Sequence, residues 1–527
     1  MSSVFKLGRA SRDVWTSRAA LSADKPFLHF QDRSWTYGAA DIEIRRYAAG
    51  LFALGVRQGD LVVVGMTNRP ETLFIQFAVR HLGGVMVGMV PGCTYDEMAY
   101  QLDHCQAGYF IADDPIASVI APRRGDFPYL KKLVLDSVER MPLDAINLAA
   151  IHADTPIGPV TLNGYDDLSP AEILYTSGST SKPKGVVLPA GALVTSGFGY
   201  ADRFEFVEED HFLLPFTFAH GTGALLAPGM VLKEGSQLTL LEKLSPSRFW
   251  GQVEESGATA VLLFPAQINL LMNAPNAPKK GESTLRIVIT HEWMGDFWER
   301  FGIPMGMTWG STETGATGAG SEPGYRGDKG QGYLGKPYAE AEIAAFDPDG
   351  RRLPAGQPGE LRLKHRHIMR KYLNAPDLTA QAVVDGWVLT GDLGMVNAEG
   401  CVWYEGRLKN MIKRSGENIS PAEVEVVIND HPAVSECMVF GVPDVIRKEE
   451  VALVVSVDEG QSLDPAELIA FASEKLARAK LPRFVQVVFG PLPRLSVGKL
   501  DRNRVAQTFD TASAWDGRAQ ATSKASN

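Results

Sequence analysis

Residues 175–185 read Tyr-Thr-Ser-Gly-Ser-Thr-Ser-Lys-Pro-Lys-Gly, and the apolar pair Ile173-Leu174 precedes them. Glycines and small hydroxyl residues allow backbone N–H groups and side-chain hydroxyls to surround a phosphate, and Lys182 and Lys184 add positive charge. The spacing differs from the Gly-x-x-x-x-Gly-Lys-Ser/Thr pattern of P-loop nucleotidases. We therefore expect a phosphate-binding loop of another kind, placed after a buried strand.

The composition predicts a globular protein with an ample apolar core. The 527 residues are 45% hydrophobic and 22% charged, and at about 150 residues per domain they fill about three domains, or a large domain and a small one. The net charge of −10 disfavours nucleic acid and anionic membranes as partners. The four cysteines form no CxxC pair, and no apolar run approaches about 18 residues. We expect a cytoplasmic protein with free thiols and no membrane insertion. We interpret residues 1–25 as an ordinary N-terminal arm or helix, with a transit peptide as the disfavoured alternative.

The hydrophobic pattern predicts an α/β protein. Helical and strand patterns alternate over residues 35–90 and return further along the chain, which is typical of parallel sheets covered by helices. Short strands and turns follow, and a compact unit of helices and strands comes last. We expect a large N-terminal domain of doubly wound α/β subdomains over residues 1–408, with a β-rich part at about 336–407, a small mobile α+β domain over 409–508, and a disordered tail over 509–527.

Several motifs in order along the chain resemble those of the adenylate-forming superfamily, which comprises acyl-CoA synthetases, luciferases and adenylation domains. The phosphate loop is similar to the signature loop of that family. The matching segments downstream are Trp309-Gly310-Ser311-Thr312-Glu313, residues 386–392, 404–413, 415–421 and 493–499. The resemblance therefore covers about residues 25–505.

The resemblance implies an ATP and magnesium site. Thr312 would contact the α-phosphate, and Glu313 would hold Mg²⁺, a hard cation that prefers carboxylate and phosphate oxygens. Asp392 would accept hydrogen bonds from the ribose hydroxyls, and Arg407 would reach the ribose or a phosphate. Trp309 would offer adenine an aromatic face. The nucleotide-binding residues implied are Thr176, Ser177, Gly178, Ser179, Thr180, Lys184, Trp309, Gly310, Thr312, Asp392, Arg407 and Lys499.

The same resemblance implies the catalytic and acyl-binding residues. Lys499 would bridge the substrate carboxylate and the α-phosphate, since a cation between two anions offsets their repulsion in the transition state. His220 would orient the carboxylate or gate its channel, with a purely structural histidine as the alternative. The catalytic set is Lys499, Thr312, Glu313 and His220, and the acyl pocket is Phe218, His220, Gly221, Trp309 and Gly315.

A further pair of segments implies transfer to a thiol. Residues 415–421 resemble the loop that lines the thiol tunnel of CoA ligases, and they contain Gly416, Glu417 and Asn418. Lys409 stands at the hinge position of the family. Lys499 would occupy space that the thiol must enter, so a rotation of the small domain about Lys409 would exchange the two functions.

The implied reaction is the ATP-dependent activation of a carboxylic acid to an acyl-adenylate, followed by transfer to CoA with release of AMP and pyrophosphate. ATP, Mg²⁺ and CoA are the implied cofactors and co-substrates. The alternative is transfer to an amine, which would make an amide. A nucleotide-binding module without chemistry is disfavoured because Glu313, Asp392, Arg407 and Lys499 occur together, and nothing indicates a luciferase-like oxygenase. A homodimer is a family-level expectation.

Two patterns are interpreted as structural. Residues 330–335 spell Gly-x-Gly-x-x-Gly, but they do not open a helix as a dinucleotide site requires. His365 and His367 alternate across Arg366, and we expect them to be exposed on one face of a strand rather than to bind metal.

Two other segments bear on the substrate. Residues 288–294 lack the run of small residues that the family usually places beside adenine. Residues 241–245 and 248–253 look like the crotonobetaine/carnitine–CoA ligase branch.

Overall fold

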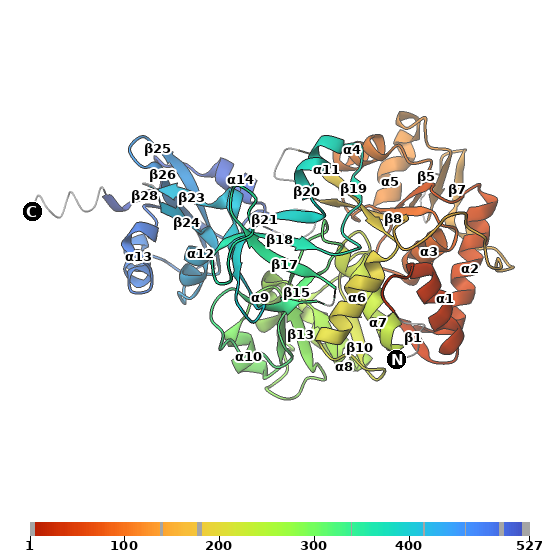
Figure 1. Cartoon of the computed structure of the whole chain (residues 1–527), viewed down its shortest axis with the longest axis horizontal. Coiled ribbons are helices and arrows are strands. Elements are labelled where there is room, and N and C mark those ends of the chain that lie inside the picture. Colours follow the sequence, from red (N-terminus) through yellow and green to blue (C-terminus); the bar gives the residue numbers. More distant parts are fainter. Residues whose placement is uncertain are drawn as a thin grey trace, which may run out of the picture. The chain divides into compact units, whose positions relative to one another are not determined.

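The chain folds into two compact units of mixed α/β structure (Figure 1). The computed structural model describes residues 6–136, 141–176, 182–338, 340–414, 417–458, 460–494 and 500–518. The first unit contains residues 1–343, 362–390 and 397–403, and the second contains 344–361, 391–396 and 404–527. Among the described residues, no helix is both long and apolar enough to cross a bilayer.

The first sheet of the first unit has the strand order β19-β9-β8-β4-β3-β5-β6-β7. The strands from β8 to β7 in this order pair in parallel, whereas β9 is antiparallel to both β8 and β19. Val62 and Val64 of β3 face one core and Val63 faces another, because successive side chains of a strand point to opposite faces. The strands are β3 (Leu61–Gly65), β4 (Val85–Gly88), β5 (Tyr109–Ala112), β6 (Lys132–Leu135), β7 (Ala145–Asn147), β8 (Pro170–Thr176), β9 (Lys184–Pro189) and β19 (Lys371–Tyr372).

A second sheet runs, within the first unit, in the order β16-β15-β14-β13-β12-β10-β11-β1-β2. Its strands from β14 to β1 pair in parallel, and β15, β16 and β2 are antiparallel to their neighbours. The strands are β1 (Pro26–Phe30), β2 (Arg33–Thr36), β10 (His211–Leu214), β11 (Gln237–Leu240), β12 (Ala260–Leu262), β13 (Ile287–Thr290), β14 (Met305–Gly310), β15 (Gly318–Gly320) and β16 (Tyr333–Pro337).

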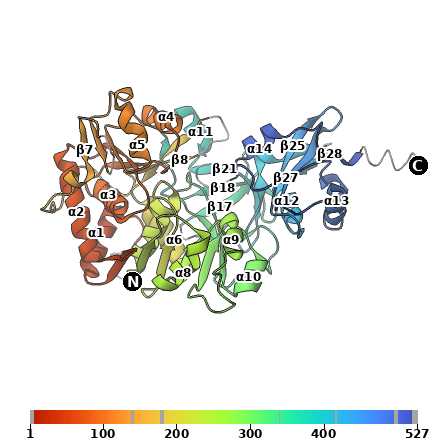
Figure 2. The ribbon, with the colours of Figure 1, turned by 180° about the vertical axis from the view of Figure 1, so that it is seen from behind.

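Helices cover both faces of both sheets. Residues of β3, β10 and α6 share one apolar core, so α3, α6 and α7 lie between the two sheets. Helices α4 and α5 pack on the outer face of the first sheet, and α8, α9 and α10 pack on that of the second. Figures 1 and 2 both show α1, α2 and α3 side by side. The prediction of parallel sheets covered by helices is confirmed.

The helices of the first unit are α1 (Ser11–Leu21), α2 (Tyr37–Ala53), α3 (Pro70–His81), α4 (Tyr95–Cys105), α5 (Ile116–Ile120), α6 (Ala192–Arg203), α7 (Ala227–Glu234), α8 (Pro246–Ser256), α9 (Pro265–Met272), α10 (Gly295–Phe301) and α11 (Pro376–Ala382), with the short turns η1 (Ala121–Asp126) and η2 (Leu148–Ile151) and the π-helix η3 (Thr222–Leu226).

The β-rich stretch, whose residues are divided between the two units, contains β17 (Glu342–Phe346), β18 (Gly359–Lys364), β20 (Val383–Val384), β21 (Trp387–Val396) and β22 (Val402–Arg407).

The second unit contains a sheet with the order β24-β23-β26-β27-β28, and β25 also pairs with β26. Helices α12 and α13 share a core with one face of this sheet, and α14 packs with the other face. The elements are β23 (Ile412–Arg414), β24 (Glu417–Ile419), α12 (Pro421–Asn429), β25 (Glu436–Asp444), β26 (Lys448–Val457), α13 (Pro465–Ser473), β27 (Phe484–Phe489), α14 (Arg502–Thr508) and β28 (Trp515–Asp516), with the turns η4 (Leu408–Asn410) and η5 (Arg478–Lys480). This is the α+β arrangement predicted for the C-terminal part.

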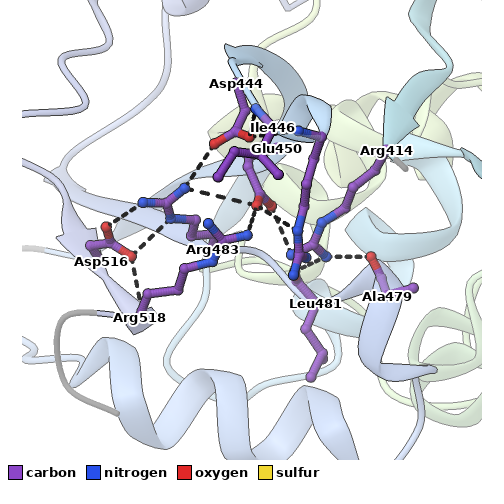
Figure 3. Close-up of polar contacts among 10 residues, drawn as sticks. Arg414, Asp444, Ile446, Glu450, Ala479, Leu481, Arg483, Asp516 and Arg518 are labelled. Carbon is purple, nitrogen blue, oxygen red and sulfur yellow. Dashed lines mark hydrogen bonds and ion pairs between the residues drawn. The ribbon is translucent and has the colours of Figure 1, made fainter. Parts of the chain in front are cut away.

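The second unit holds a buried charged cluster, shown in Figure 3, which we name the Glu450 cluster. The Glu450 side chain is fully buried, and Arg414, Arg447, Arg483 and Arg518 surround its carboxylate. Arg414 Nη2 lies 2.7 Å from Glu450 Oε2. A carboxylate removed from water needs such partners, because an unpaired buried charge is costly.

The Glu450 cluster also orders part of the segment that the sequence predicts to be a disordered tail. Strand β28 pairs with β27, with Asp516 opposite Phe484. Arg483 donates two hydrogen bonds to the Asp516 carboxylate, at 3.0 and 2.9 Å, and Arg518 pairs with Glu450. For residues 509–518 the structure therefore differs from the prediction, since these ion pairs tie the segment to the sheet.

Candidate active site

The ends of the predicted phosphate loop are fixed by a hairpin and a helix. Strands β8 and β9 are antiparallel, with Thr176 opposite Lys184. Helix α4 contacts both ends of the loop, since the Tyr100 hydroxyl donates to the Pro183 carbonyl at 2.8 Å and His104 Nδ1 lies 2.8 Å from the Tyr175 hydroxyl. The predicted phosphate ligands Ser177, Gly178, Ser179 and Thr180 lie outside the described residues.

The turn after β14 carries Thr312 and Glu313. The Ser311 N–H donates to Thr314 Oγ1 at 2.9 Å, which closes the turn, and the Gly315 N–H donates to the Thr312 carbonyl at 2.9 Å. Gly315 has a φ of 64°, and a Cβ there would lie 2.7 Å from the His367 carbonyl oxygen. Position 315 therefore requires glycine for both backbone conformation and space.

Tyr372 connects two of the predicted residues. Its hydroxyl donates to Glu313 Oε1 at 2.9 Å, and Lys184 Nζ lies 4.9 Å from the centre of its ring. Burial, and secondarily Glu313, raise the pKa of Tyr372, so its hydroxyl remains a donor at neutral pH. The structure thus brings Glu313 and Lys184, which come from separate motifs, to one side chain that the sequence analysis did not identify.

The donor set fits magnesium bound with a nucleotide. Among the described residues, no group of three His, Cys, Asp or Glu side chains could hold a metal alone. Mg²⁺ in nucleotide sites commonly takes one or two carboxylates and completes its shell with phosphate oxygens and water. The Glu313 carboxylate, in the same turn as the Thr312 hydroxyl, offers such hard oxygen ligands.

An aromatic row lies at the predicted acyl side. The His220 ring stacks on Phe216, with centroids 5.4 Å apart, and meets the edge of Phe264 at 5.8 Å. Phe264 stacks on His291 at 5.2 Å. The Thr222 N–H donates to His220 Nδ1 at 3.3 Å, so the proton of the neutral ring is on Nε2. Phe218, also predicted for the pocket, is buried.

The sequence analysis did not identify Phe264, and it noted His291 only as part of the unusual segment 288–294. Both follow the ends of parallel strands, β12 and β13, and the carboxyl ends of such strands are where α/β sheets bind ligands. His291 Nδ1 lies 3.0 Å from the Thr308 carbonyl oxygen. This contact brings the unusual segment 288–294 beside Trp309, the buried aromatic residue predicted to face adenine.

A buried polar group supports the π-helix that follows Gly221. The Ala224 carbonyl accepts from Gln76 Nε2 and from Arg80 Nη2, both at 3.1 Å. Arg80 also pairs with Glu172 at 2.7 Å, and both side chains are 1% exposed. A π-helix leaves some carbonyls without their usual partners, and α3 supplies donors for one of them.

The predicted ribose residues belong to the second unit. Arg407 Nε lies 2.7 Å from Asp392 Oδ1, and Asp392 is buried. Burial, and secondarily Asp392, raise the pKa of the neighbouring Tyr404 to about 12. Lys409 lies in η4, and the backbones of Glu417 and Asn418 lie in β24. Gly416 and Lys499 fall outside the described residues.

The expectation that His365 and His367 are exposed on a strand is wrong. Strand β18 ends at Lys364, and both histidines are buried in the turn that follows. His365 Nε2 donates to the Thr314 carbonyl at 2.9 Å, and His367 lies between Thr195 Oγ1 and Asp167 Oδ2, each at 2.7 Å. Both are buried because their rings bond to groups of other segments, and burial lowers the pKa of His365 to about 4.

Comparisons with known proteins match nearly the whole chain. The family model described as AMP-binding enzyme matches residues 15–373, and that of the AMP-binding enzyme C-terminal domain matches 423–499. The chain is 32% identical over 516 residues to the crotonobetaine/carnitine–CoA ligase of Salmonella typhimurium, which covers 94% of this chain and 98% of the relative. The corresponding ligase of Proteus mirabilis is 32% identical over 513 residues, covering 93% and 97%.

Solved structures share the fold. An anthranilate CoA ligase in complex with anthranoyl-AMP superimposes with a TM-score of 0.86 at 23% identity, covering 95% of this chain and 97% of that one. The O-succinylbenzoate CoA synthetase of Bacillus subtilis, in complex with ATP and magnesium, gives 0.81 at 24% identity, covering 94% and 99%.

Proposed function

The chain belongs to the AMP-binding enzyme family and, within it, to the AMP-forming acid–thiol ligases, and from this premise we propose that it joins a small carboxylic acid to CoA through an acyl-adenylate. The proposal rests on one observation: Tyr372 contacts both the Glu313 carboxylate and the Lys184 ammonium group, beside the predicted phosphate loop. A carboxylate for the metal and a cation for the phosphates are what a site for magnesium and ATP requires.

In the first half-reaction, a carboxylate oxygen of the acid attacks the α-phosphorus of ATP, and pyrophosphate leaves. Glu313 would hold the metal, which when bound would offset negative charge on the phosphates. Lys184 contacts the phosphates, and the Thr312 hydroxyl donates to the α-phosphate. Lys499 would act between the carboxylate and the α-phosphate, where its charge would reduce their repulsion in the transition state.

The remaining predicted residues complete this proposal. Asp392 accepts from the ribose hydroxyls, and Arg407, its ion-pair partner, reaches the same nucleotide. His220, with its proton on Nε2, donates to the acid's carboxylate and orients it.

In the second half-reaction, the CoA thiol attacks the carbonyl carbon of the acyl-adenylate, and AMP leaves. Gly416, Glu417 and Asn418 would border the path of the thiol. A rotation of residues 409–508 against 1–408, with Lys409 as the hinge, exchanges Lys499 for this loop between the two steps.

The aromatic row guides the choice of acid. The curated relatives are named for crotonobetaine and carnitine, which are quaternary-ammonium acids. Aromatic faces attract such cations, so Phe216 and Phe264 would suit this class. Trimethylammonium acids therefore come first in a substrate panel, before aromatic and short aliphatic acids.

The test is mass spectrometry of the products formed from ATP, Mg²⁺ and each acid, with CoA, with a mixture of amines, and with neither. An acyl-CoA that requires CoA, and that Glu313→Gln and Lys499→Ala abolish, is the expected result. An amide formed from an amine without CoA would instead assign the acid–amine alternative.

A further inference from the structure

Tyr372 touches two groups of opposite charge that the proposed reaction needs. Its hydroxyl donates to Glu313 Oε1 at 2.9 Å, and its ring centre lies 4.9 Å from Lys184 Nζ. Tyr372 is only 6% exposed, so both contacts form in a largely dehydrated environment. A hydrogen bond to an ionised carboxylate and a cation over an aromatic face are both strengthened there.

The sheet fixes the position of Tyr372. In the register of β19 with β9, Tyr372 lies opposite Val186, and Lys184 is two residues from Val186 on the same face. The Tyr372 N–H donates to Thr379 Oγ1 at 2.9 Å, and the next N–H, of Leu373, donates to the Gly185 carbonyl at 2.8 Å. The ring is therefore held beside Lys184 by the backbone on both sides.

The Glu313 turn is held from the same segment. The Met369 N–H donates to the Glu313 carbonyl at 2.9 Å, while the Tyr372 hydroxyl holds one side-chain oxygen. This leaves Glu313 Oε2 in a fixed direction. A hydrogen-bonded partner that orients a metal-binding carboxylate in this way lowers the entropy lost when the metal binds.

Tyr372 contacts both charged groups. In the part of the chain that the structure describes, no ion pair within 4 Å joins Lys184 to a carboxylate, although Glu313 and Lys184 contact the same side chain. A direct ion pair would neutralise both groups and would have to break before magnesium and phosphate could bind.

We propose that Tyr372 is a positioning residue of the magnesium–ATP site, whose hydroxyl orients the Glu313 carboxylate and whose ring holds Lys184 apart from it. This inference rests on the proposed function. It assigns to the hydroxyl a role in metal affinity and to the ring a role in nucleotide affinity, and the two can be measured separately.

The experiment uses Mn²⁺ as the metal probe and α,β-methylene ATP as a nucleotide that cannot transfer AMP to the acid, because its α- and β-phosphorus atoms are joined through carbon. Electron paramagnetic resonance of free Mn²⁺ gives the metal affinity of the enzyme–nucleotide complex, and titration in EDTA gives the nucleotide affinity without metal. Tyr372→Phe should weaken Mn²⁺ about tenfold and leave nucleotide affinity in EDTA unchanged. Tyr372→Leu, which also removes the ring, should weaken both.

Tyr333→Phe is the matched control. Tyr333 is also buried, and its hydroxyl donates to Glu322 Oε2 at 2.8 Å, so this variant removes the same kind of bond elsewhere in the first unit. Neither affinity should change in this control. Thermal unfolding of each variant checks that it is folded.

Two results would overturn the inference while leaving the proposed function intact. One is wild-type Mn²⁺ affinity in Tyr372→Phe. The other is an equal loss of nucleotide affinity with and without metal in Tyr372→Phe, which would indicate general damage to the site. Failure of the wild-type chain to bind α,β-methylene ATP at all would instead overturn the proposed function and the inference together.

Discussion

At the scale of single residues, His365 shows how a buried side chain supports the site through both ring nitrogens. Nε2 donates to the Thr314 carbonyl at 2.9 Å, and Nδ1 accepts from the His367 N–H at 3.1 Å. The second contact needs an unprotonated Nδ1, so protonation of the ring would break it. The turn that carries Glu313 is thus supported by a histidine that must stay neutral.

The free energy of unfolding should therefore depend on pH through His365. Its pKa is lowered from 6.5 to about 4 by burial, so the unfolded state takes up the proton first and stability falls as the pH drops from 6.5 towards 4. Below pH 4, this group makes the free energy of unfolding about 3 kcal/mol lower than it is at neutral pH. Glutamine can donate to Thr314 and accept from His367 without titrating, so His365→Gln should flatten this slope. Denaturant unfolding at a series of pH values measures the free energy of unfolding of both proteins. If this free energy fell equally with pH in the wild type and in His365→Gln, the assignment to His365 would be contradicted.

At the scale of secondary-structure elements, α4 is the support of the phosphate loop. The Tyr100 hydroxyl donates to the Pro183 carbonyl at 2.8 Å, and Lys182 Nζ lies 5.5 Å from the centre of the Tyr100 ring. His104, one turn later, contacts Tyr175 at the other end of the loop. One helix therefore holds both strand ends from which the loop departs.

Removing one of these contacts should weaken ATP binding without destroying the enzyme. Tyr100→Phe loses the hydroxyl but keeps the ring beside Lys182, and a net hydrogen bond of about 1 kcal/mol corresponds to a roughly fivefold higher KM for ATP. The KM for the acid should stay unchanged, because the bond lies at the loop. Tyr95→Phe, on the same helix, removes an exposed bond to Asp126 and serves as the control. A rise in both KM values would show a general loss of structure instead.

The elements also show what the sequence could and could not predict. Glu313 and Lys184 stand in motifs that are continuous along the chain, and the parallel strands follow from alternating apolar patterns. Tyr372 depends on the register of β19 with β9, which no local pattern encodes. The two-residue strand β28 is likewise too short for periodicity, and it depends on Arg483, about thirty residues earlier in the chain.

The buried histidines were mispredicted for a related reason. An alternating pattern predicts which side chains share a face of a strand, but it does not locate the end of the strand. Because β18 ends at Lys364, His365 and His367 lie in a turn, where tertiary contacts decide burial. Sequence reasoning therefore works best for residues whose neighbours in space are also neighbours in the chain.

At the scale of the whole molecule, each unit has its own apolar core and its own buried ion pair. The first unit buries Arg80 with Glu172, and the second buries Glu450 among four arginines. Removing one partner of a buried pair leaves an uncompensated charge, which costs about 3–5 kcal/mol. The two pairs therefore provide one specific way to destabilise each unit.

Units with separate cores should unfold in separate transitions, and the two buried pairs can assign them. In scanning calorimetry, Arg80→Met should lower the midpoint of one transition by several degrees and leave the other in place. Glu450→Gln, which leaves the arginines of the Glu450 cluster without their carboxylate, should lower only the other transition. Arg80→Met combined with Glu172→Gln should recover part of the first loss, because no buried charge then remains unpaired. If both single variants instead moved one common transition, the two units would unfold as a single cooperative structure, and the division of the chain would have no thermodynamic counterpart.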